Sequence, residues 1–331
     1  MTAQLKIRDL GLSVKVDGAS RRILRGVSFD IAPGEALGLV GESGSGKSMT
    51  ARAVTGMLPK GASTTGEILF EGTRLDSMGK RALAKHRRSA VALIPQDPQA
   101  SINPVHTVGD FLTEPLRVLQ GLNATEASSR AIASLRDVGI TDGQRRLEQY
   151  PHELSGGLLQ RVMICSALLS GARLIVADEP TTALDVTTQS EVMAILNELR
   201  TSRQLSLLFI THDLELAAAV CGRIAVMYAG EIVEIQEAER LEDHPRHPYT
   251  QGLLLARPSI DAVRFPLPSI PGRAVSPNDV PDACAFAPRC THAQERCRSG
   301  RPALLAYGHA LVRCVRADEI TLDGSAETVQ Q

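Results

Sequence analysis

An eight-residue stretch near the N-terminus has the residue types and spacing of a loop that wraps phosphate groups. Residues 41–48 fit the pattern G-x-x-x-x-G-K-[ST]. The three glycines of this stretch let backbone N–H groups turn toward one anion, Lys47 adds a positive charge, and Ser48 offers a hydroxyl to Mg²⁺. We therefore predict a site for the phosphates of a nucleoside triphosphate. The predicted nucleotide-binding residues are Gly41, Glu42, Ser43, Gly44, Ser45, Gly46, Lys47, Ser48 and Met49.

Two acidic side chains end a short apolar segment farther along the chain. Residues 173–180 predict a buried strand with Asp178 and Glu179 at its carboxyl end. Ligands bind at that edge of a parallel sheet, where Asp178 could hold the Mg²⁺ shell and Glu179 could polarise an attacking water. The alternative is that both acids only cap the next turn. His212 also follows a predicted strand, and its place beside the inferred phosphate site favours a catalytic role.

The elements that must position these groups follow from the hydrophobic pattern. Residues 35–40 predict a buried strand and residues 49–57 predict a helix, so the glycine loop lies at a strand-to-helix junction. Alternating apolar and polar residues in 5–31 and 66–72 predict a small antiparallel sheet.

A long helical pattern follows a predicted strand at 90–95. It covers residues 97–170 and predicts an inserted helical lobe. Within it, residues 154–157 read Leu-Ser-Gly-Gly and precede an apolar helix, which provides a second helix N-terminus able to hold an anion. By itself this signal is weak. Interruptions of the helical pattern are expected at Pro104, Pro115 and Pro151.

The whole chain has the composition of a soluble globular protein. It is 43% hydrophobic and 22% charged, and its length of 331 residues predicts a core of more than about two hundred residues with an appended piece. The net charge of −1 gives no general attraction to nucleic acid or to an anionic membrane. No long apolar run is present, and residues 1–10 lack the apolar centre of a signal peptide, so we expect neither membrane spanning nor export.

Six cysteines divide into two groups. Cys165 and Cys221 stand singly on helix-like stretches and are expected to be small buried hydrophobic residues. The other four lie in a proline-rich tail, where thiolates could hold together a segment with little core of its own. Disulfides are disfavoured in a chain without an export signal, and the spacing departs from the paired cysteines of structural zinc sites. The spacing suits a cluster reached from separate loops, at Cys284, Cys290, Cys297 and Cys314.

Taken together, the motifs resemble the ATPase subunit of an ABC transporter over about residues 5–235. In chain order they are GESGSGKS at 41–48, Gln96, LSGG at 154–157, LIVADE at 174–179, Ala183-Leu184-Asp185 and His212. The LSGG sequence separates this family from other phosphate-loop ATPases. The resemblance implies an α/β fold with a mixed core sheet, an antiparallel subdomain and an inserted helical lobe.

The resemblance also implies a role for each motif. Two ATPase domains would pair head to tail, with each ATP between one phosphate loop and the partner's signature residues, Ser155, Gly156 and Gly157. Gln96 would sense the γ-phosphate, join Ser48 and Asp178 at Mg²⁺, and couple to the membrane partner. Asp185 would lie at the dimer seam. His212 would hold the γ-phosphate and the attacking water, beside the catalytic Glu179.

Two positions depart from the family pattern. Leu158 stands where the commonest signature has glutamine, and this change is expected to be harmless. Val16 stands about where an aromatic side chain stacks on adenine. The loss of a stacking face predicts a selectivity for adenine that is weaker by about 1 kcal/mol, unless a neighbouring residue substitutes.

The last part of the chain resembles the C-terminal extension of ATPases from dipeptide, oligopeptide and nickel importers. The matching residues are HPRHPYTQGLL at 244–254, Pro-Gly-Arg at 271–273, and the spaced cysteines. The resemblance implies that the four tail cysteines ligate a [4Fe–4S] cluster, with zinc left open. The predicted divisions are an ATPase domain at 1–240 with its lobe at about 97–170, the extension at 241–316, and a disordered tail at 317–331.

These features predict an ATP-hydrolysing subunit of a bacterial ABC importer for di- or oligopeptides, peripheral to the cytoplasmic face of the inner membrane. Its ligands would be ATP and Mg²⁺. Its partners would be a paralogous ATPase in a heterodimer, two transmembrane permeases and an extracytoplasmic solute-binding protein, and no nucleic acid. Nickel, glutathione or an opine-like solute stay open as cargo.

A soluble ABC ATPase acting on nucleic acid or ribosomes would usually carry two ATPase domains or a long coiled-coil insertion. A non-hydrolysing regulatory subunit is disfavoured by the presence of Glu179 and His212.

Overall fold

The computed structural model describes residues 3–182, 184–257 and 269–324. The chain divides into two compact units. The first unit combines residues 1–31, 36–76 and 210–331, and the second combines residues 32–35 and 77–209.

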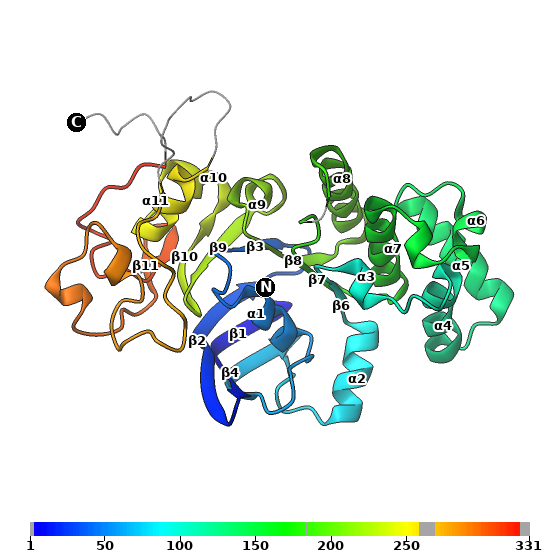
Figure 1. The fold of residues 1–331 in the computed structure, drawn as a ribbon, viewed down its shortest axis with the longest axis horizontal. Coiled ribbons are helices and arrows are strands. Elements are labelled where there is room, and N and C mark those ends of the chain that lie inside the picture. The colour runs from blue at the N-terminus through cyan, green and yellow to red at the C-terminus, as the bar shows by residue number, and fades with distance from the viewer. Residues whose placement is uncertain (1–2, 183, 258–268, 325–331) are drawn as a thin grey trace. The chain divides into compact units, whose positions relative to one another are not determined.

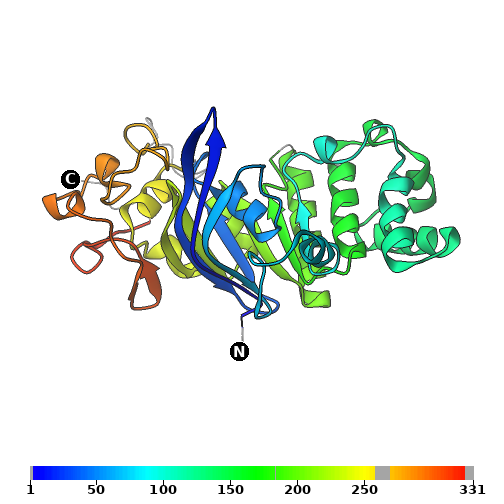
Figure 2. The same ribbon diagram turned by 90° about the horizontal axis from the view of Figure 1, so that it is seen from below.

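An antiparallel sheet forms one part of the first unit. Its strands are β1 (Leu5–Val16), β2 (Ala19–Ile31), β4 (Ser63–Phe70) and β5 (Thr73–Arg74), in the order β2-β1-β4-β5. Asp17 and Gly18 both have positive φ and turn β1 into β2, which makes the long blue hairpin of Figure 2. Leu5, Ile7 and Leu10 of β1 are buried. The predicted antiparallel sheet is confirmed.

A second set of strands in the first unit carries the glycine loop. It comprises β3 (Ala36–Val40), β9 (Arg223–Tyr228), β10 (Glu231–Glu237), β12 (Ala310–Val312) and β11 (Leu305–Tyr307). β3 is parallel to β9, and the strands from β9 to β11 pair antiparallel. Every residue of β3 is buried, as its continuous apolar sequence predicts for a strand covered on both faces. Helix α1 (Lys47–Val54) follows the loop, and α9 (Leu214–Val220) packs on β3.

Part of the C-terminal extension continues this sheet. The hairpin β11–β12 joins β10, and helices α10 (Ala238–Asp243) and α11 (Pro248–Leu255) precede it (Figure 1). Buried Arg313 follows β12 and donates hydrogen bonds to the carbonyls of Ile232 and Pro302, which fastens the hairpin to the sheet. Most of the remaining extension is irregular, as expected, with short 3₁₀ turns at η2 (Ala287–Arg289) and η3 (Glu295–Cys297). Of the tail expected to be disordered, residues 325–331 lie outside the described residues.

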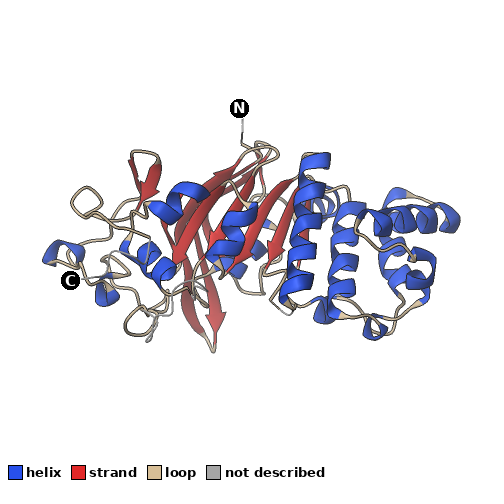
Figure 3. Ribbon diagram, turned by 90° about the horizontal axis from the view of Figure 1, so that it is seen from above, coloured by secondary structure: helices blue, strands red, loops and turns tan. Residues whose placement is uncertain are grey.

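The second unit combines a short parallel sheet with the predicted helical lobe. Strands β6 (Val91–Ile94) and β7 (Leu174–Asp178) pair in parallel, and β8 (Ser206–Thr211) lies beside β7. The stretch from 98 to 169, fully described, contains only helices and turns, seen as the blue coils of the lobe in Figure 3. The helices of the unit are α2 (Lys80–Ser89), α3 (Pro98–Ser101), α4 (Val108–Gln120), α5 (Ala124–Asp137), α6 (Gly143–Glu148), η1 (Pro151–Glu153), α7 (Gly156–Leu169) and α8 (Val186–Arg203).

The interruption predicted at Pro115 is wrong. Pro115 lies inside α4, which runs without a break. A proline in a helix removes one backbone hydrogen bond, but Pro115 is on the exposed side while Leu112 and Leu116 are buried against the lobe. A capping box at Thr107 and Asp110 also fixes the start of the helix. Packing and capping therefore outweigh the cost of the proline.

Candidate functional site: a phosphate loop, two strand ends and a signature helix

The glycine loop of residues 41–48 lies between β3 and α1, as predicted. Gly44 and Gly46 have φ of +79° and +109°, a region that other residues rarely adopt. At Gly41, an added Cβ would lie 2.1 Å from the carbonyl oxygen of Met227. The glycine pattern is therefore a requirement of the backbone in this loop.

The polar groups of this loop fit a phosphate ligand. Lys47 is 5% exposed, and its Nζ donates hydrogen bonds to the carbonyls of Gly41 at 2.7 Å and Glu42 at 3.0 Å. The Oγ of Ser45 is buried and has no hydrogen-bond partner among the described residues. A bound anion would meet the N-terminus of α1 and the charge of Lys47, and would offer an acceptor to the Ser45 hydroxyl. Ser48, the predicted Mg²⁺ ligand, is the second residue of α1.

In the second unit, the structure brings two predicted catalytic residues together. Asp178 ends β7, and Glu179 follows it with φ of +48°, an uncommon conformation for a residue with a side chain. Gln96 follows the parallel strand β6 and donates from Nε2 to Glu179 Oε2 at 3.2 Å. The same oxygen accepts a hydrogen bond from Thr182 Oγ1 at 3.0 Å. Thr182 was not among the predicted site residues. Its position three residues after the predicted catalytic carboxylate of Glu179 was the sequence feature that could have indicated it.

The signature residues start helix α7. Ser155 is the N-cap and accepts a hydrogen bond from the N–H of Leu158. A Cβ on Gly157 would lie 2.4 Å from Thr188 Cγ2, so packing against α8 requires this glycine. A Cβ on Gly156 would meet only Leu184 at 3.6 Å, an ordinary contact distance. Nothing in the described chain therefore requires a glycine at 156.

The residue predicted for the dimer seam, Asp185, caps helix α8 in this chain. It accepts hydrogen bonds from the N–H of Thr188 at 3.0 Å and from its hydroxyl at 2.7 Å. These hydrogen bonds, the backbone one first, lower the pKa of Asp185. Asp185 is exposed, and Ala183 of the same motif lies outside the described residues.

A cleft of about 640 Å³ is lined by Gln96, Gly156 and Thr182 among others, so the ends of β6, β7 and α7 open on one space.

The predicted site residues divide between the two units. The phosphate loop and His212 belong to the first unit, whereas Gln96, Asp178, Glu179, the signature and Asp185 belong to the second. His212 is exposed directly after β8, and the next residue, Asp213, caps α9.

The four tail cysteines line one small cavity of about 20 Å³. Burial raises the pKa of the Cys284 thiol to about 12 and raises those of Cys290 and Cys314 as well. All six cysteines of the chain are described and none forms a disulfide. Across the described residues, no group of three or more His, Cys, Asp or Glu side chains is arranged to hold a metal ion. Cys165 and Cys221 are buried, as expected.

Two residues of the extension that were given no role at the ATP site contact the phosphate loop. Arg289 forms an ion pair with Glu42, and the hydroxyl of Tyr249 accepts a hydrogen bond from the Glu42 N–H. A buried arginine so far along the chain has no local sequence signal that would reveal its partner.

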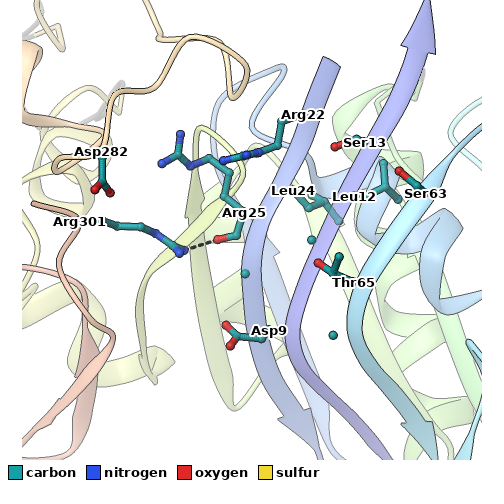
Figure 4. A pocket seen from close by; sticks show the side chains of 13 residues that line it. Asp9, Leu12, Ser13, Arg22, Leu24, Arg25, Ser63, Thr65, Asp282 and Arg301 are labelled. Carbon is teal, nitrogen blue, oxygen red and sulfur yellow. Dashed lines mark hydrogen bonds between the residues drawn. The ribbon is translucent and has the colours of Figure 1, made fainter. Parts of the chain in front are cut away.

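A separate pocket of about 660 Å³ lies where the extension meets the antiparallel sheet (Figure 4). Arg301 reaches across from the extension and donates hydrogen bonds to the carbonyl of Arg25 and to Glu231, which also pairs with the Arg25 guanidinium. No residue of the phosphate loop lines this pocket. Arg301 thereby joins the extension to β2 through the Arg25 carbonyl and to β10 through Glu231.

The part of the chain that the structure describes contains no helix long and apolar enough to cross a membrane.

Two family profiles match the chain. Residues 24–182 match the ABC transporter family, and residues 233–297 match the C-terminal region of oligopeptide/dipeptide transporters. The second match covers α11 and three of the four tail cysteines.

Curated relatives match nearly the whole chain. A peptide import ATP-binding protein of Brucella abortus (strain 2308) is 42% identical over 94% of each chain. The dipeptide transport protein DppD of Escherichia coli (strain K12) is 42% identical over 91% of this chain and 93% of its own. The oligopeptide transport protein OppD of Haemophilus influenzae is 39% identical over 95% of this chain and 97% of its own.

Solved structures agree with the fold. The dimeric ABC transporter cassette MJ0796 has a TM-score of 0.63 at 26% identity, and it covers 71% of this chain and 98% of its own. The cbiO1 subunit of Clostridium perfringens has a TM-score of 0.62 at 25% identity, over 73% of this chain and 91% of its own. The predicted α/β fold of an ABC ATPase is confirmed. The chain belongs to the ATP-binding subunits of ABC transporters, in the group that carries the oligopeptide/dipeptide transporter C-terminal region.

Proposed function

We propose that this ATPase powers the uptake of di- or oligopeptides into a bacterial cell. The observation that carries the proposal is one chain that combines the phosphate loop, the Gln96–Glu179 pair and the extension matched to oligopeptide/dipeptide transporters. The relatives from Brucella, Escherichia and Haemophilus are named for peptide import or transport, which supports the same cargo.

Uptake in cells tests the cargo. A strain without this gene should lose uptake of labelled di- and oligopeptides, and the wild-type gene should restore it while Lys47→Ala should not. Uptake of nickel, glutathione and an opine measured in the same strains serves as the comparison. Loss of one of these with normal peptide uptake would overturn the peptide assignment.

We assign the hydrolytic roles to the residues at the strand ends. Lys47 and the loop N–H groups would bind the phosphates, and Ser48, Asp178 and Gln96 would hold Mg²⁺, which supplies charge neutralisation on the phosphates. Glu179 would orient and deprotonate the attacking water, because its carboxylate is already positioned by Gln96 and Thr182. His212 would contact the γ-phosphate. Met49 and the exposed Ser43 complete the nucleotide-binding set.

We propose that a second ATPase subunit completes each site, with its Ser155, Gly156 and Gly157 facing the ATP bound here. The exposure of Gly156 supports this, since nothing in the described chain requires a glycine at that position. The cassette MJ0796 was solved as a dimer. The partner would be a paralogue, and the pair would dock on two permeases at the cytoplasmic face of the inner membrane, supplied by an extracytoplasmic binding protein. Native mass spectrometry of the purified transporter would count one copy of this chain in a heterodimer and two in a homodimer.

We also propose that the four tail cysteines hold a [4Fe–4S] cluster that stabilises the extension. The common cavity supports this ligand set, and four thiolates are what such a cluster takes. The cluster would supply folding free energy to a segment with few helices and strands, and the thiols would have to lose their protons to bind it. Residues of the ATP site are not involved in this role.

Iron analysis of anaerobically purified protein tests the cluster. We expect brown protein with about four iron and four sulfide per chain, as ligation by four thiolates requires. Cys290→Ser should lose the iron, whereas Cys221→Ser, a buried cysteine outside the cavity, should keep it. Stoichiometric zinc without iron or sulfide would overturn the cluster assignment.

A further inference from the structure

Arg289 connects the cysteine-bearing segment of the extension to the phosphate loop. It precedes Cys290, and its side chain is 5% exposed. Its Nη1 lies 2.7 Å from Glu42 Oε2, and its Nη2 lies 3.1 Å from Glu42 Oε1. Guanidinium and carboxylate therefore meet through two parallel hydrogen bonds, the most directional form of an ion pair. Glu42 is the second residue of the phosphate loop.

Contacts outside the phosphate loop, from the extension and from β9, hold Arg289 in place. Its Nε donates to the carbonyl of Pro271 at 2.8 Å, and the guanidinium lies over the rings of Tyr228 and Phe286 at 5.7 and 5.9 Å. These contacts restrict the rotamers of the side chain, so little further entropy is lost when it binds Glu42. The hydrogen bonds to Glu42 raise the pKa of Arg289, which keeps the guanidinium charged.

A second residue of the extension holds the same point of the loop. Fully buried Tyr249 on α11 accepts a hydrogen bond from the Glu42 N–H at 2.9 Å, while the Glu42 carbonyl accepts one from Lys47. The side chain and the N–H of Glu42 are thus bound by the extension, and its carbonyl by the lysine that meets the phosphates. The extension therefore restrains the loop backbone that carries Lys47 through its contacts with Glu42.

The charge of Glu42 gives this contact a direct bearing on nucleotide binding. ATP brings several negative charges to the loop, and an unpaired carboxylate there would repel them. The ion pair with Arg289 cancels that charge within the loop itself. Because the pair is largely buried, salt screens it less than it would screen an exposed pair.

We propose that Arg289 is a positioning residue for ATP binding, which fixes the phosphate loop through Glu42 and neutralises that carboxylate, so that nucleotide affinity depends on the folded C-terminal extension. This inference rests on ATP binding at the phosphate loop. It is independent of the cargo.

Nucleotide affinity of the full-length chain and turnover of the assembled transporter test the proposal. Arg289→Gln should weaken ATP binding about tenfold, as expected when one partner of a largely buried pair is removed. Arg289→Lys should weaken it less, because lysine keeps the charge but not the paired geometry. In both variants KM for ATP should rise while kcat at saturating ATP stays within about twofold, since no contact to the reacting atoms is lost.

A double-mutant cycle separates this role from general destabilisation. Glu42→Gln in the Arg289→Gln background should recover part of the ATP affinity, because the unpaired carboxylate is removed. Arg313→Gln is the matched control, since Arg313 is a buried arginine of the same extension that binds Ile232 and Pro302 instead of the loop. It should leave ATP affinity unchanged, and thermal unfolding of each variant shows whether it is folded.

Three outcomes would overturn the proposal. They are unchanged ATP affinity in folded Arg289→Gln, additive effects in the double variant, and an equal loss of affinity in folded Arg313→Gln. If Arg289→Gln does not fold, the Lys variant decides by the same criteria. Failure of peptide uptake with normal ATP affinities would count against the proposed cargo alone.

Discussion

The phosphate loop and the signature helix are both glycine-rich helix N-termini, but they are built in different ways. Around the loop, Ser45 and Lys47 are 3% and 5% exposed, and the extension binds Glu42 through Arg289 and Tyr249. At the signature, Ser155 and Gly156 are exposed, and only Gly157 is required by packing inside the chain. The polar groups of the loop are thus held by contacts within its own unit. The first residues of the signature are exposed, which fits the proposal that they face ATP bound by a second subunit.

The largest effect is expected at Glu179, the residue of the second unit that we propose as the catalytic base. Glu179→Gln keeps the shape and the hydrogen-bonded position but removes the base, so ATP hydrolysis by the assembled transporter should fall at least about 100-fold. ATP affinity should be retained, because the phosphate loop is untouched. Phosphate release and nucleotide binding measured on the same preparation check both halves of the prediction. Wild-type turnover in this variant would remove Glu179 from the mechanism or show that the partner's site does all the work.

The chain has eight histidines, and the burial of one of them, His247, makes stability depend on pH. His212 is exposed directly after β8, whereas His247 is 1% exposed in the extension and caps α11 by accepting the Tyr249 N–H. Burial lowers the pKa of His247 to about 3. The unfolded chain therefore takes up this proton first, and stability is lost as pH falls below about 6.5 toward 3, by at most about 1.4 kcal/mol per pH unit.

Buried Glu234 changes stability with pH in the opposite direction. Burial raises its pKa to about 7 from 4.5, so the folded state holds this proton between those values, and its contribution to stability declines as pH rises through that window. The two contributions offset each other between about pH 4.5 and 6.5.

His247→Asn keeps an acceptor at the cap and removes the titration. Chemical denaturation of the variant should show stability that falls as pH rises from 4.5 to 7. A variant with the wild-type pH profile would contradict this assignment.

We expect substitutions of the two signature glycines, Gly156 and Gly157, to affect different properties of the protein. Gly157→Ala would bring a methyl to Thr188 and should lower the free energy of unfolding of the isolated subunit by about 1–3 kcal/mol. Gly156→Ala should leave that free energy unchanged and instead slow ATP turnover of the assembled transporter. Denaturant unfolding and ATPase assays on both variants check the pair of expectations. Equal destabilisation by the two variants would mean that the signature is packed within its own chain.

The smallest effect concerns the base of the nucleotide. Val16 ends β1 at the hairpin turn and cannot provide a flat ring, so we expect ATP and GTP to bind with affinities within a few-fold of each other. Val16→Tyr should favour ATP by about 1 kcal/mol. Competition between the two nucleotides for the wild type and the variant measures this. A strong preference of the wild type for ATP would place another aromatic side chain at the adenine.

Local chemistry explains why much of this protein could be predicted without a structure. The phosphate loop and the antiparallel sheet depend on short-range requirements, such as glycines at positive φ and apolar residues in alternation, and these are visible in consecutive residues. The burial of Cys165 and Cys221 follows in the same way. Pro115 shows the limit of local rules, because the packing of Leu112 and Leu116 on the lobe carries α4 past it.

Only the tertiary structure revealed contacts between residues distant in the chain. Gln96 meets Glu179 because two parallel strands end side by side, and the four tail cysteines line one cavity because separate turns converge. Arg289 reaches Glu42 although the two residues lie 247 positions apart in the sequence. A single sequence specifies which side chains can form such pairs. Which pairs form depends on chain packing, because burial and geometry select one partner among many of suitable charge.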